Sequence, residues 1–264
     1  MKVVFLCASE YGFECLRCVC DILNCNVVGV ITMPKQYEIT YDNGRKSRIA
    51  DNPILDELFE FCELGKKELF ISKKVNSLET INKVKKWSPD LIIVSGWYQI
   101  IKKDILDLPS KGVIGLHASM LPQYRGGAPL VWQMINGEEY AGISLFYMDE
   151  GCDTGDIIAQ KQVKICDGDT IKELYERVGK TGIDLLRENI PLIESGTANR
   201  FKQDDGYEGS VFPPRTEEDG LIDWRKSSKD IMNFVRAQTR PYPGAYTIIG
   251  NKKITIWDCS IEDI

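Results

Sequence analysis

The beginning of the chain alternates short apolar runs with an amphipathic segment. Residues 2–7 (KVVFLC) are apolar and rich in branched side chains, which predicts a buried strand. Residues 11–23 have the apolar spacing of a helix, and residues 26–32 (NVVGVIT) predict a second buried strand. A strand, a helix and a strand at this spacing predict a parallel βαβ unit with a right-handed crossover. Residues 33–52 are polar by contrast and are predicted to form a loop.

The same alternation of strand-like and helix-like segments continues to residue 195. We expect helices over residues 53–64, 78–87, 102–108, 128–136 and 170–195, and strands over residues 69–71, 89–94, 112–116, 142–148 and 160–165. Strands that alternate with helices are typical of a doubly wound α/β fold with a mostly parallel sheet. We therefore place one α/β domain over residues 1–205.

The pattern changes in the last quarter of the chain. Residues 206–220 (GYEGSVFPPRTEEDG) are rich in Gly, Pro and charged side chains and are predicted to be a connector. Residues 228–237 have helical spacing, and residues 246–249 and 253–257 predict a β-hairpin. Residues 206–264 are therefore expected to form a small C-terminal α+β appendage.

The composition is that of a globular protein with an acidic balance. The 264 residues are 43% hydrophobic and 27% charged, so the chain can bury a core. The formal net charge of −6 argues against a general nucleic-acid binder, because such proteins usually carry a basic surplus. No apolar run approaches the ~20 residues of a membrane span, and the N-terminus lacks the features of a signal peptide. We expect a cytoplasmic protein with no membrane partner.

The nine cysteines need an explanation. Their number is odd, and in a cytosolic protein they stay reduced, so a disulfide framework is disfavoured. The spacing Cys15-x-x-Cys18-x-Cys20 resembles one half of a zinc site, but no second pair follows at a matching distance. The segment also reads as an amphipathic helix. Buried free thiols are therefore the favoured interpretation.

His117 is the only histidine in the chain. It follows the strand predicted over residues 112–116, and open parallel sheets bind ligands at the carboxyl ends of their strands. Imidazole is the natural proton carrier near neutral pH, so an acid–base role is favoured over that of a satisfied core histidine. A single histidine excludes a multi-histidine metal site. The chain also lacks G-x-G-x-x-G after its first strand and any G-x-x-x-x-G-K-[ST] loop, which leaves dinucleotide and nucleoside triphosphate chemistry without support.

An acidic segment, residues 149–156 (DEGCDTGD), follows another predicted strand. Such a segment can be an ordinary acidic turn. One of its carboxylates can instead orient His117 and stabilise the protonated ring. The residues alone do not select the carboxylate.

A resemblance to a known family rests on residues 112–129 (GVIGLHASMLPQYRGGAP), with Trp132, the sequence Asn-Gly-Glu at 136–138 and Asp-Thr-Gly at 153–155. This pattern resembles the signature of the folate-dependent formyltransferases, which include the methionyl-tRNA, glycinamide ribonucleotide and amino-sugar branches. The resemblance covers nearly the whole chain and implies a formyltransferase-like variant of the Rossmann fold. Residues 212–216 (FPPRT) and 240–245 (RPYPGA) look like the C-terminal region of the sugar and tRNA branches.

The resemblance implies a catalytic role for His117 and Asp153. They match the histidine and the aspartate of the family's catalytic trio, whereas the asparagine is replaced by Gly115. Three explanations of Gly115 are open. Another side chain supplies the missing hydrogen-bond donor, with Gln133 and Ser119 as candidates; a backbone N–H or an ordered water replaces it; or catalysis is weak. The implied reaction is transfer of a formyl group from N10-formyltetrahydrofolate to a primary amine. His117, oriented by Asp153, would exchange the protons.

The resemblance also implies where the folate would bind, with no metal required. Residues 89–108 are similar to the strand and loop that line the folate pocket. The candidate folate-binding residues lie in that loop and in the acidic segment; they are Gly96, Trp97, Tyr98, Gln99, Ile100, Asp149, Gly151 and Thr154.

The acceptor is expected to be a small molecule. The tRNA branch carries a larger C-terminal domain with a basic surface, whereas this acidic chain has only a short appendage. We favour an amino sugar as the acceptor, preferably a nucleotide-linked one that is used in lipopolysaccharide or surface glycan biosynthesis. We expect no nucleic-acid partner, and a homodimer is possible. Arg45, Lys46 and Arg48 either meet a diphosphate or form a solvated basic loop. The alternatives are a catalytically impaired folate or nucleotide-sugar binding protein and a formyltetrahydrofolate hydrolase.

Overall fold

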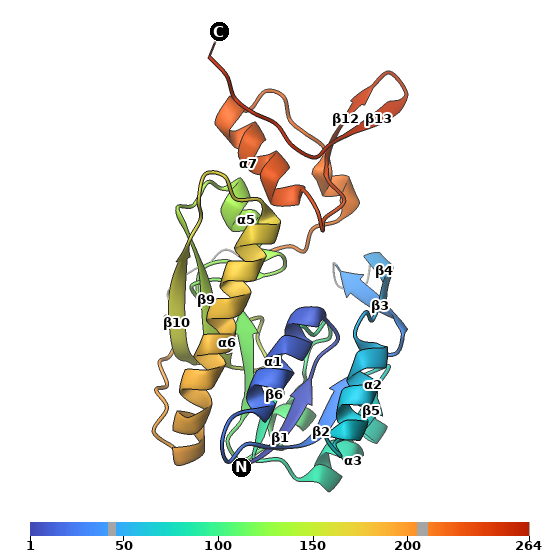
Figure 1. Cartoon of the computed structure of the whole chain (residues 1–264), viewed down its shortest axis with the longest axis vertical. Coiled ribbons are helices and arrows are strands. Elements are labelled where there is room, and N and C mark those ends of the chain that lie inside the picture. The colour runs from blue at the N-terminus through green and yellow to red at the C-terminus, as the bar shows by residue number, and fades with distance from the viewer. Residues whose placement is uncertain (42–45, 205–210, 264) are drawn as a thin grey trace. The chain divides into compact units, whose positions relative to one another are not determined.

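A seven-stranded sheet with the strand order β10-β9-β7-β6-β1-β2-β5 forms the centre of the fold (Figure 1). The computed structural model describes residues 1–41, 46–204 and 211–263. The strands of the sheet are β1 (Lys2–Leu6), β2 (Asn26–Thr32), β5 (Glu68–Ile71), β6 (Leu91–Val94), β7 (Val113–His117), β9 (Tyr140–Tyr147) and β10 (Ile157–Lys164).

Five neighbouring strands of this sheet run parallel, from β5 through β2, β1 and β6 to β7. The pair β9–β10 runs antiparallel, because the Tyr147 N–H donates to the Asp156 carbonyl and the Ile165 N–H donates to the Glu139 carbonyl. The expected α/β class with a mostly parallel sheet is confirmed.

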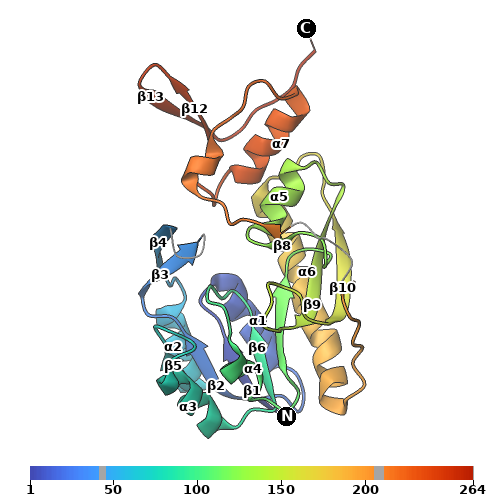
Figure 2. The ribbon, with the colours of Figure 1, turned by 180° about the vertical axis from the view of Figure 1, so that it is seen from behind.

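Helices cover both faces of the sheet. On one face, α3 (Leu78–Trp87) and α4 (Lys103–Leu106) pack against alternate residues of β1 and β6 (Figure 2). The buried cluster there includes Val4, Leu6, Ile81, Val84, Trp87, Ile92, Val94 and Ile105. On the other face, α1 (Glu10–Cys20) lies beside the second half of α6 (Ile171–Ser195), and the Cys18 thiol donates to the Ile183 carbonyl at 3.8 Å (Figure 1). The remaining helix of this part is α2 (Leu55–Leu64).

Capping explains where α1 begins. Ser9 has an extended backbone, and its hydroxyl accepts the Gly12 N–H at 3.2 Å. Phe13, Leu16 and Val19 then follow at helical spacing and are buried against the sheet.

The prediction of a loop over residues 33–52 is wrong. The segment forms an antiparallel hairpin of β3 (Gln36–Tyr41) and β4 (Lys46–Asp51). Tyr37 and Ile39 alternate with polar residues and are buried in a cluster with Ala8 and Met33. The charged residues masked this period of two, which is the signal of a half-buried strand. Arg45 lies outside the described residues; Lys46 and Arg48 belong to β4, and the Arg48 side chain is exposed.

The chain divides into two compact units that are interleaved in sequence. Unit 1 comprises Met1–His117, Leu145–Ala159 and Gly182–Gln203, and unit 2 comprises Ala118–Ser144, Gln160–Thr181 and Asp204–Ile264. The proposed domain division after residue 205 stays a prediction.

Unit 2 contains the C-terminal elements and the segment after β7. Its elements besides parts of β9, β10 and α6 are β8 (Arg125–Gly126), α5 (Pro129–Ile135), β11 (Val211–Phe212), a 3₁₀ helix (Glu217–Gly220), α7 (Ser228–Gln238), β12 (Ala245–Ile249) and β13 (Lys252–Ile256). The predicted helix and hairpin of the C-terminal region are therefore present. Within the predicted connector, residues 206–210 lie outside the described part, and β11 adds a short parallel pair to β8.

The cysteines are free thiols, but the expected burial holds for only four of the nine, and Cys152 and Cys166 are exposed. Cys15 and Cys18 are buried on α1, and burial raises the pKa of Cys15 to about 11. In the part of the chain that the structure describes, no group of three His, Cys, Asp or Glu side chains is arranged to hold a metal ion. Among the same residues, no helix is both long enough and apolar enough to cross a membrane.

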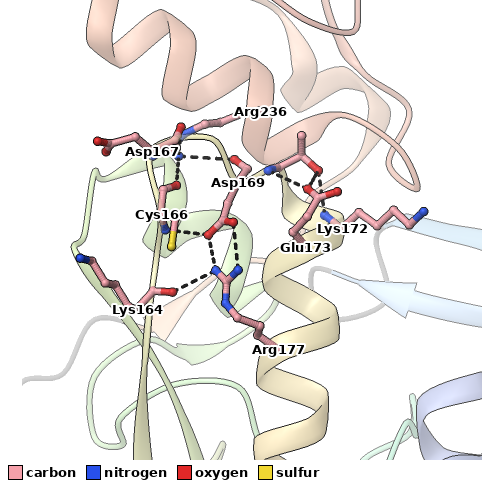
Figure 3. A network of polar contacts seen from close by, with 9 residues as sticks. Lys164, Cys166, Asp167, Asp169, Lys172, Glu173, Arg177 and Arg236 are labelled. Atoms are coloured by element: carbon pink, nitrogen blue, oxygen red, sulfur yellow. Dashed lines mark hydrogen bonds and ion pairs between the residues drawn. The ribbon is translucent and has the colours of Figure 1, made fainter.

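A polar network ties α7 to the turn between β10 and α6 (Figure 3). Arg236 of α7 donates to the carbonyls of Cys166, Asp167 and Asp169 at 2.9, 3.1 and 3.4 Å. The Asp169 carboxylate accepts the Cys166 N–H at 2.6 Å and forms an ion pair with Arg177. The Arg177 guanidinium holds the pKa of Asp169 below its usual value.

We expect Asp169→Asn to destabilise the protein by about 1–3 kcal/mol at pH 7, because it removes a buried charge-assisted hydrogen bond. The pKa of Asp169 is lowered in the folded state, so its contribution is present above pH ~5 and is lost as the pH falls below ~4. Urea denaturation of both proteins from pH 7 to pH 3 measures this difference. Asp167→Asn, at an exposed neighbour, is the control; a gap that does not shrink in acid contradicts the assignment.

Candidate active site

Three neighbouring strands bring the candidate residues to one edge of the sheet. Leu6 of β1 lies opposite Val94 of β6, and Val94 lies opposite Gly115 of β7. His117 is the second residue after Gly115 and ends β7, so it lies level with the start of the loop that follows β6. The order of the strands reverses between β1 and β6, and such a switch point is where doubly wound sheets bind ligands.

His117 and Asp153 face each other at this edge. The Nδ1 atom of His117 lies 3.5 Å from Oδ2 of Asp153, and the side chains are only 9% and 21% exposed. A carboxylate in this place favours the tautomer with a proton on Nδ1 and directs Nε2 to exchange protons with another molecule. The structure therefore brings together the two residues that the sequence singled out; their catalytic role stays a prediction.

The acidic segment forms a turn that is closed by its own side chains. Oδ1 of Asp149 accepts the Gly151 N–H at 3.0 Å and the Thr154 hydroxyl at 2.7 Å. Gly155 passes so close to β9 that a Cβ atom would lie 1.7 Å from the Tyr147 carbonyl oxygen, so a glycine is required there. The three predicted folate-binding residues of this segment thus shape the turn that carries Asp153.

The loop after β6 begins with a tight approach to the loop after β1. The Gly96 carbonyl accepts the Ala8 N–H at 3.0 Å, and a Cβ atom on Gly96 would lie 1.8 Å from the Ser9 hydroxyl. Gly96 has a φ of 61°, which favours glycine. The indole Nε1 of Trp97 is buried without a hydrogen-bond partner, although Trp97 itself is half-buried. A buried donor without an acceptor suits a ligand that presents one.

The other three residues of this loop differ in what they offer. Tyr98 is 44% exposed and contacts the Tyr37 ring, with a centroid distance of 5.7 Å, and Ile100 is largely exposed. The Gln99 amide donates to the Lys73 carbonyl at 2.9 Å and accepts the Val75 N–H at 2.8 Å. Gln99 is therefore engaged in holding the loop, whereas Tyr98 and Ile100 present aromatic and apolar surface.

Gly115 leaves a space that the protein itself fills. A Cβ atom at this position would meet the Met148 sulfur at 3.3 Å, Cγ of Met148 at 3.4 Å and the Phe146 ring at 3.5 Å. Gly115 and His117 lie two residues apart on β7, so they share one face of the sheet. Met148, which the sequence analysis did not single out, therefore packs tightly against the position that the Cβ atom of a side chain at residue 115 would take.

The two residues considered as substitute donors are already engaged. The Ser119 hydroxyl donates to the Gln123 carbonyl at 2.6 Å. Both hydrogens of the Gln133 amide are directed at carbonyls, those of Ala118 and Pro129, each at 2.9 Å. Neither side chain has a donor to spare in this arrangement.

Gln203 is a second residue that sequence reasoning missed. Its side chain is buried, and its amide nitrogen donates to the carbonyls of Asp153 and Gly155. It lies in a polar stretch before the predicted connector, and no motif marks it.

A cavity of about 600 Å³ lies at the opposite end of β7, where Gly112 and Val113 line it together with Lys111. The cations around it have partners within the protein. Lys111 donates to the Ile193 and Glu194 carbonyls, Arg200 pairs with Asp156, and Lys103 pairs with Asp107. The cations that line the cavity are thus engaged within the protein, and Glu150 adds an exposed carboxylate to its lining.

Comparison with known proteins gives two complementary findings. The sequence matches the family described as "Formyl transferase" over residues 1–190 and "Formyl transferase, C-terminal domain" over residues 215–264. It is 35% identical over 263 residues to "Methionyl-tRNA formyltransferase" of Ruminiclostridium cellulolyticum, covering 100% of this chain and 80% of that protein.

The fold is similar to that of solved sugar N-formyltransferases. A sugar N-formyltransferase from a Shewanella species superposes with a TM-score of 0.73 at 18% identity, covering 100% of this chain and 99% of that one. An N-formyltransferase from Helicobacter canadensis, in complex with folinic acid and dTDP-3-aminofucose, has a TM-score of 0.70 at 22% identity, covering 96% and 86%. At these identities the likeness concerns the fold.

The packing at Gly115 leads to a test of stability. We expect Gly115→Asn to cost about 1–3 kcal/mol, because the new side chain overpacks the space that Met148 occupies. Combining it with Met148→Ala should recover most of this loss, since the smaller side chain vacates that space. Urea denaturation of the two single variants and the double variant gives the coupling energy. Strictly additive effects would show that Met148 does not fill the space at Gly115.

Proposed function

This chain belongs to the formyl transferase family, and we propose that it transfers the formyl group of N10-formyltetrahydrofolate to the primary amine of an amino sugar, preferably a nucleotide-linked one. The family match spans residues 1–190 and includes every candidate catalytic and folate-binding residue. The proposal further places the enzyme in the cytoplasm, where a nucleotide sugar and a reduced folate meet.

The proposed chemistry uses His117 as the proton carrier. The neutral amine attacks the formyl carbon, and a tetrahedral intermediate with a negatively charged oxygen forms. Nε2 of His117 takes the proton that the amine loses and returns a proton to N10 of the folate as the bond from carbon to N10 breaks. Asp153 holds Nδ1 of the ring through these steps, at the 3.5 Å distance of the resting site.

The negatively charged oxygen needs a positive or hydrogen-bonding neighbour. Gly115 has no side chain, and the space beside it is taken by the Met148 thioether, which is no donor. The donors of Ser119 and Gln133 are engaged with carbonyls. We therefore assign this role to the His117 imidazolium, which forms when the ring takes the amine proton and carries its charge while the tetrahedral intermediate exists.

The loop after β6 suits the folate. Its Trp97 N–H is buried without an acceptor, and the oxygen and nitrogen atoms of a pteridine ring can supply one. Tyr98 and Ile100 offer exposed aromatic and apolar surface for a flat ring. Gly96 and Gln99 shape the loop, and Asp149, Gly151 and Thr154 hold the turn that faces His117; folate binding by these five residues stays a prediction.

The charge of the C-terminal region carries the assignment of the acceptor. Residues 215–264 hold eight Lys or Arg and eight Asp or Glu residues, so this region has no basic surplus. Several of its cations are also engaged within unit 2: Arg215 with the Asp219 carbonyl, Arg225 with Asp223, Arg236 with three carbonyls, Arg240 over the Trp257 ring and Lys253 with Glu217. A module that grips tRNA needs cations for phosphates, whereas a small amine does not.

Methionyl-tRNA is the second candidate acceptor. It is favoured by the 35% identity to the Ruminiclostridium cellulolyticum protein over the whole length of this chain. A folate or nucleotide-sugar binder without activity and a formyltetrahydrofolate hydrolase are the remaining alternatives. One experiment separates all of them: incubation with N10-formyltetrahydrofolate, with and without each amine. Release of tetrahydrofolate that requires an amine identifies a transferase, release without an amine identifies a hydrolase, and no release identifies a binder.

The catalytic pair gives the first functional prediction. We expect His117→Ala to lower kcat by about 10²–10⁴-fold, because no other group exchanges the protons. Asp153→Asn should cost a loss in the same range, since the ring then lacks the carboxylate that selects its tautomer. Stopped-flow release of tetrahydrofolate measures both. Asp156→Asn, in which the lost carboxylate faces Arg200 instead, is the matched control and should keep its activity. Near wild-type turnover by His117→Ala would refute the mechanism.

The acceptor gives the second functional prediction. At physiological salt we expect formylation of a nucleotide-linked 3-amino or 4-amino deoxy sugar and no formylation of charged initiator tRNA, because the C-terminal region has no net positive charge. Mass spectrometry of the sugar and acid gel electrophoresis of the tRNA detect the two products. A kcat/KM for tRNA that exceeds the value for every amino sugar tested would select the second candidate.

A further inference from the structure

The turn that carries Asp153 has a costly backbone conformation. Asp153 has a φ of 55°, in the left-handed region that a residue with a side chain rarely adopts. The preceding residues Glu150, Gly151 and Cys152 are exposed, so burial does not hold this part of the chain. Asp149 holds the turn at two points on either side of Asp153, the Gly151 N–H and the Thr154 hydroxyl. Neither of these two bonds is made by the carbonyls of Asp153 and Gly155, and a further restraint acts on those.

Gln203 supplies this restraint with a single amide group. Its side chain is 6% exposed, and its nitrogen donates to the Asp153 carbonyl at 2.9 Å and to the Gly155 carbonyl at 2.7 Å. One –NH₂ group with two hydrogens thus binds the carbonyls on either side of Thr154.

The main chain beside Gln203 is itself held in place. Phe201 and Ile157, the first residue of β10, exchange two backbone hydrogen bonds, with N–O distances of 2.9 and 2.7 Å. This bridge lies two residues before Gln203, so the amide starts from a point that is tied to the sheet. The restraint therefore runs from β10 through residues 201–203 to the turn.

We propose that Gln203 is a positioning residue for the His117–Asp153 pair; its effect on catalysis rests on the proposed function. By holding the Asp153 main chain in the left-handed conformation, it sets the direction in which the carboxylate leaves the turn, toward Nδ1 of His117. The Gln203 amide bonds to main-chain carbonyls of the turn, and it acts on the reaction through Asp153.

The chain offers a direct spectroscopic readout. His117 is the only histidine, so a ¹⁵N spectrum of the imidazole contains signals of one ring. At a pH at which the ring is neutral, the shifts report which nitrogen carries the proton. We expect the proton on Nδ1 in the wild type. In Gln203→Met, which has similar length but cannot donate to the carbonyls, we expect a mixture of both tautomers that approaches the spectrum of Asp153→Asn.

Kinetics give the second arm of the test. We expect Gln203→Met to lower kcat by about 10–10²-fold, because a displaced carboxylate misorients the ring, with KM for either substrate nearly unchanged. Gln203→Asn is smaller and remains polar but is too short to span both carbonyls, so it should show the same pattern. Lys202→Met, the same change at the exposed neighbouring residue, is the control and should match the wild type in both readouts.

The outcomes are distinguishable. Wild-type tautomer and kcat in both Gln203 variants would overturn the proposal. If circular dichroism shows that Gln203→Met is unfolded, Gln203→Asn decides. A tautomer shift in a protein that transfers no formyl group supports the positioning role and refutes the proposed function instead.

Discussion

The parallel pairing of β1, β6 and β7 is the constraint on which the site depends. Because Leu6, Val94 and Gly115 share one level of the sheet, the loops after these strands leave it together. The close approach of Gly96 to Ser9 follows directly from this register, as does the place of His117 beside the loop after β6. Shifting one strand by a single residue would turn His117 to the other face, away from Asp153. The buried apolar runs that fix the register are thus what places the chemistry.

Much of this arrangement could be predicted from the sequence. The apolar runs of β1, β2 and β6 mark strands buried on both faces, and the position of His117 after such a run places it at the ligand-binding edge. The resemblance to a family then singled out Asp153. The hairpin of β3 and β4 was not predicted, because only a few apolar residues among charged ones show the alternation of a strand.

The side chains that support the site could not be predicted, for a physical reason. The Gln203 side chain bonds to two main-chain carbonyls. Because every residue has a main-chain carbonyl, no pattern of residue types predicts such a contact. Met148 packs at Gly115 because this residue has no side chain. The contact depends on how β7 pairs with β9, which Met148 directly follows, and the sequence does not reveal this pairing. The folate-binding role of Gln99 stays a prediction, but the engagement of its amide with residues 73 and 75 could not be foreseen, because a side-chain amide bonds to nearby backbone as readily as to a ligand.

The interleaving of the two units determines when the site comes into being during synthesis. Unit 1 takes the five parallel strands of the sheet from the first 117 residues. The carboxylate that faces His117 is contributed by its second segment, and Gln203 by the end of its third. Gln203 follows Asp153 by 50 residues, and the intervening chain enters and leaves unit 2. A growing chain therefore contains the strand that ends in His117 before it contains Asp153 and Gln203. The sheet can begin to fold early, while the His117–Asp153 pair is assembled by contacts of long sequence separation, which are the slow ones to form.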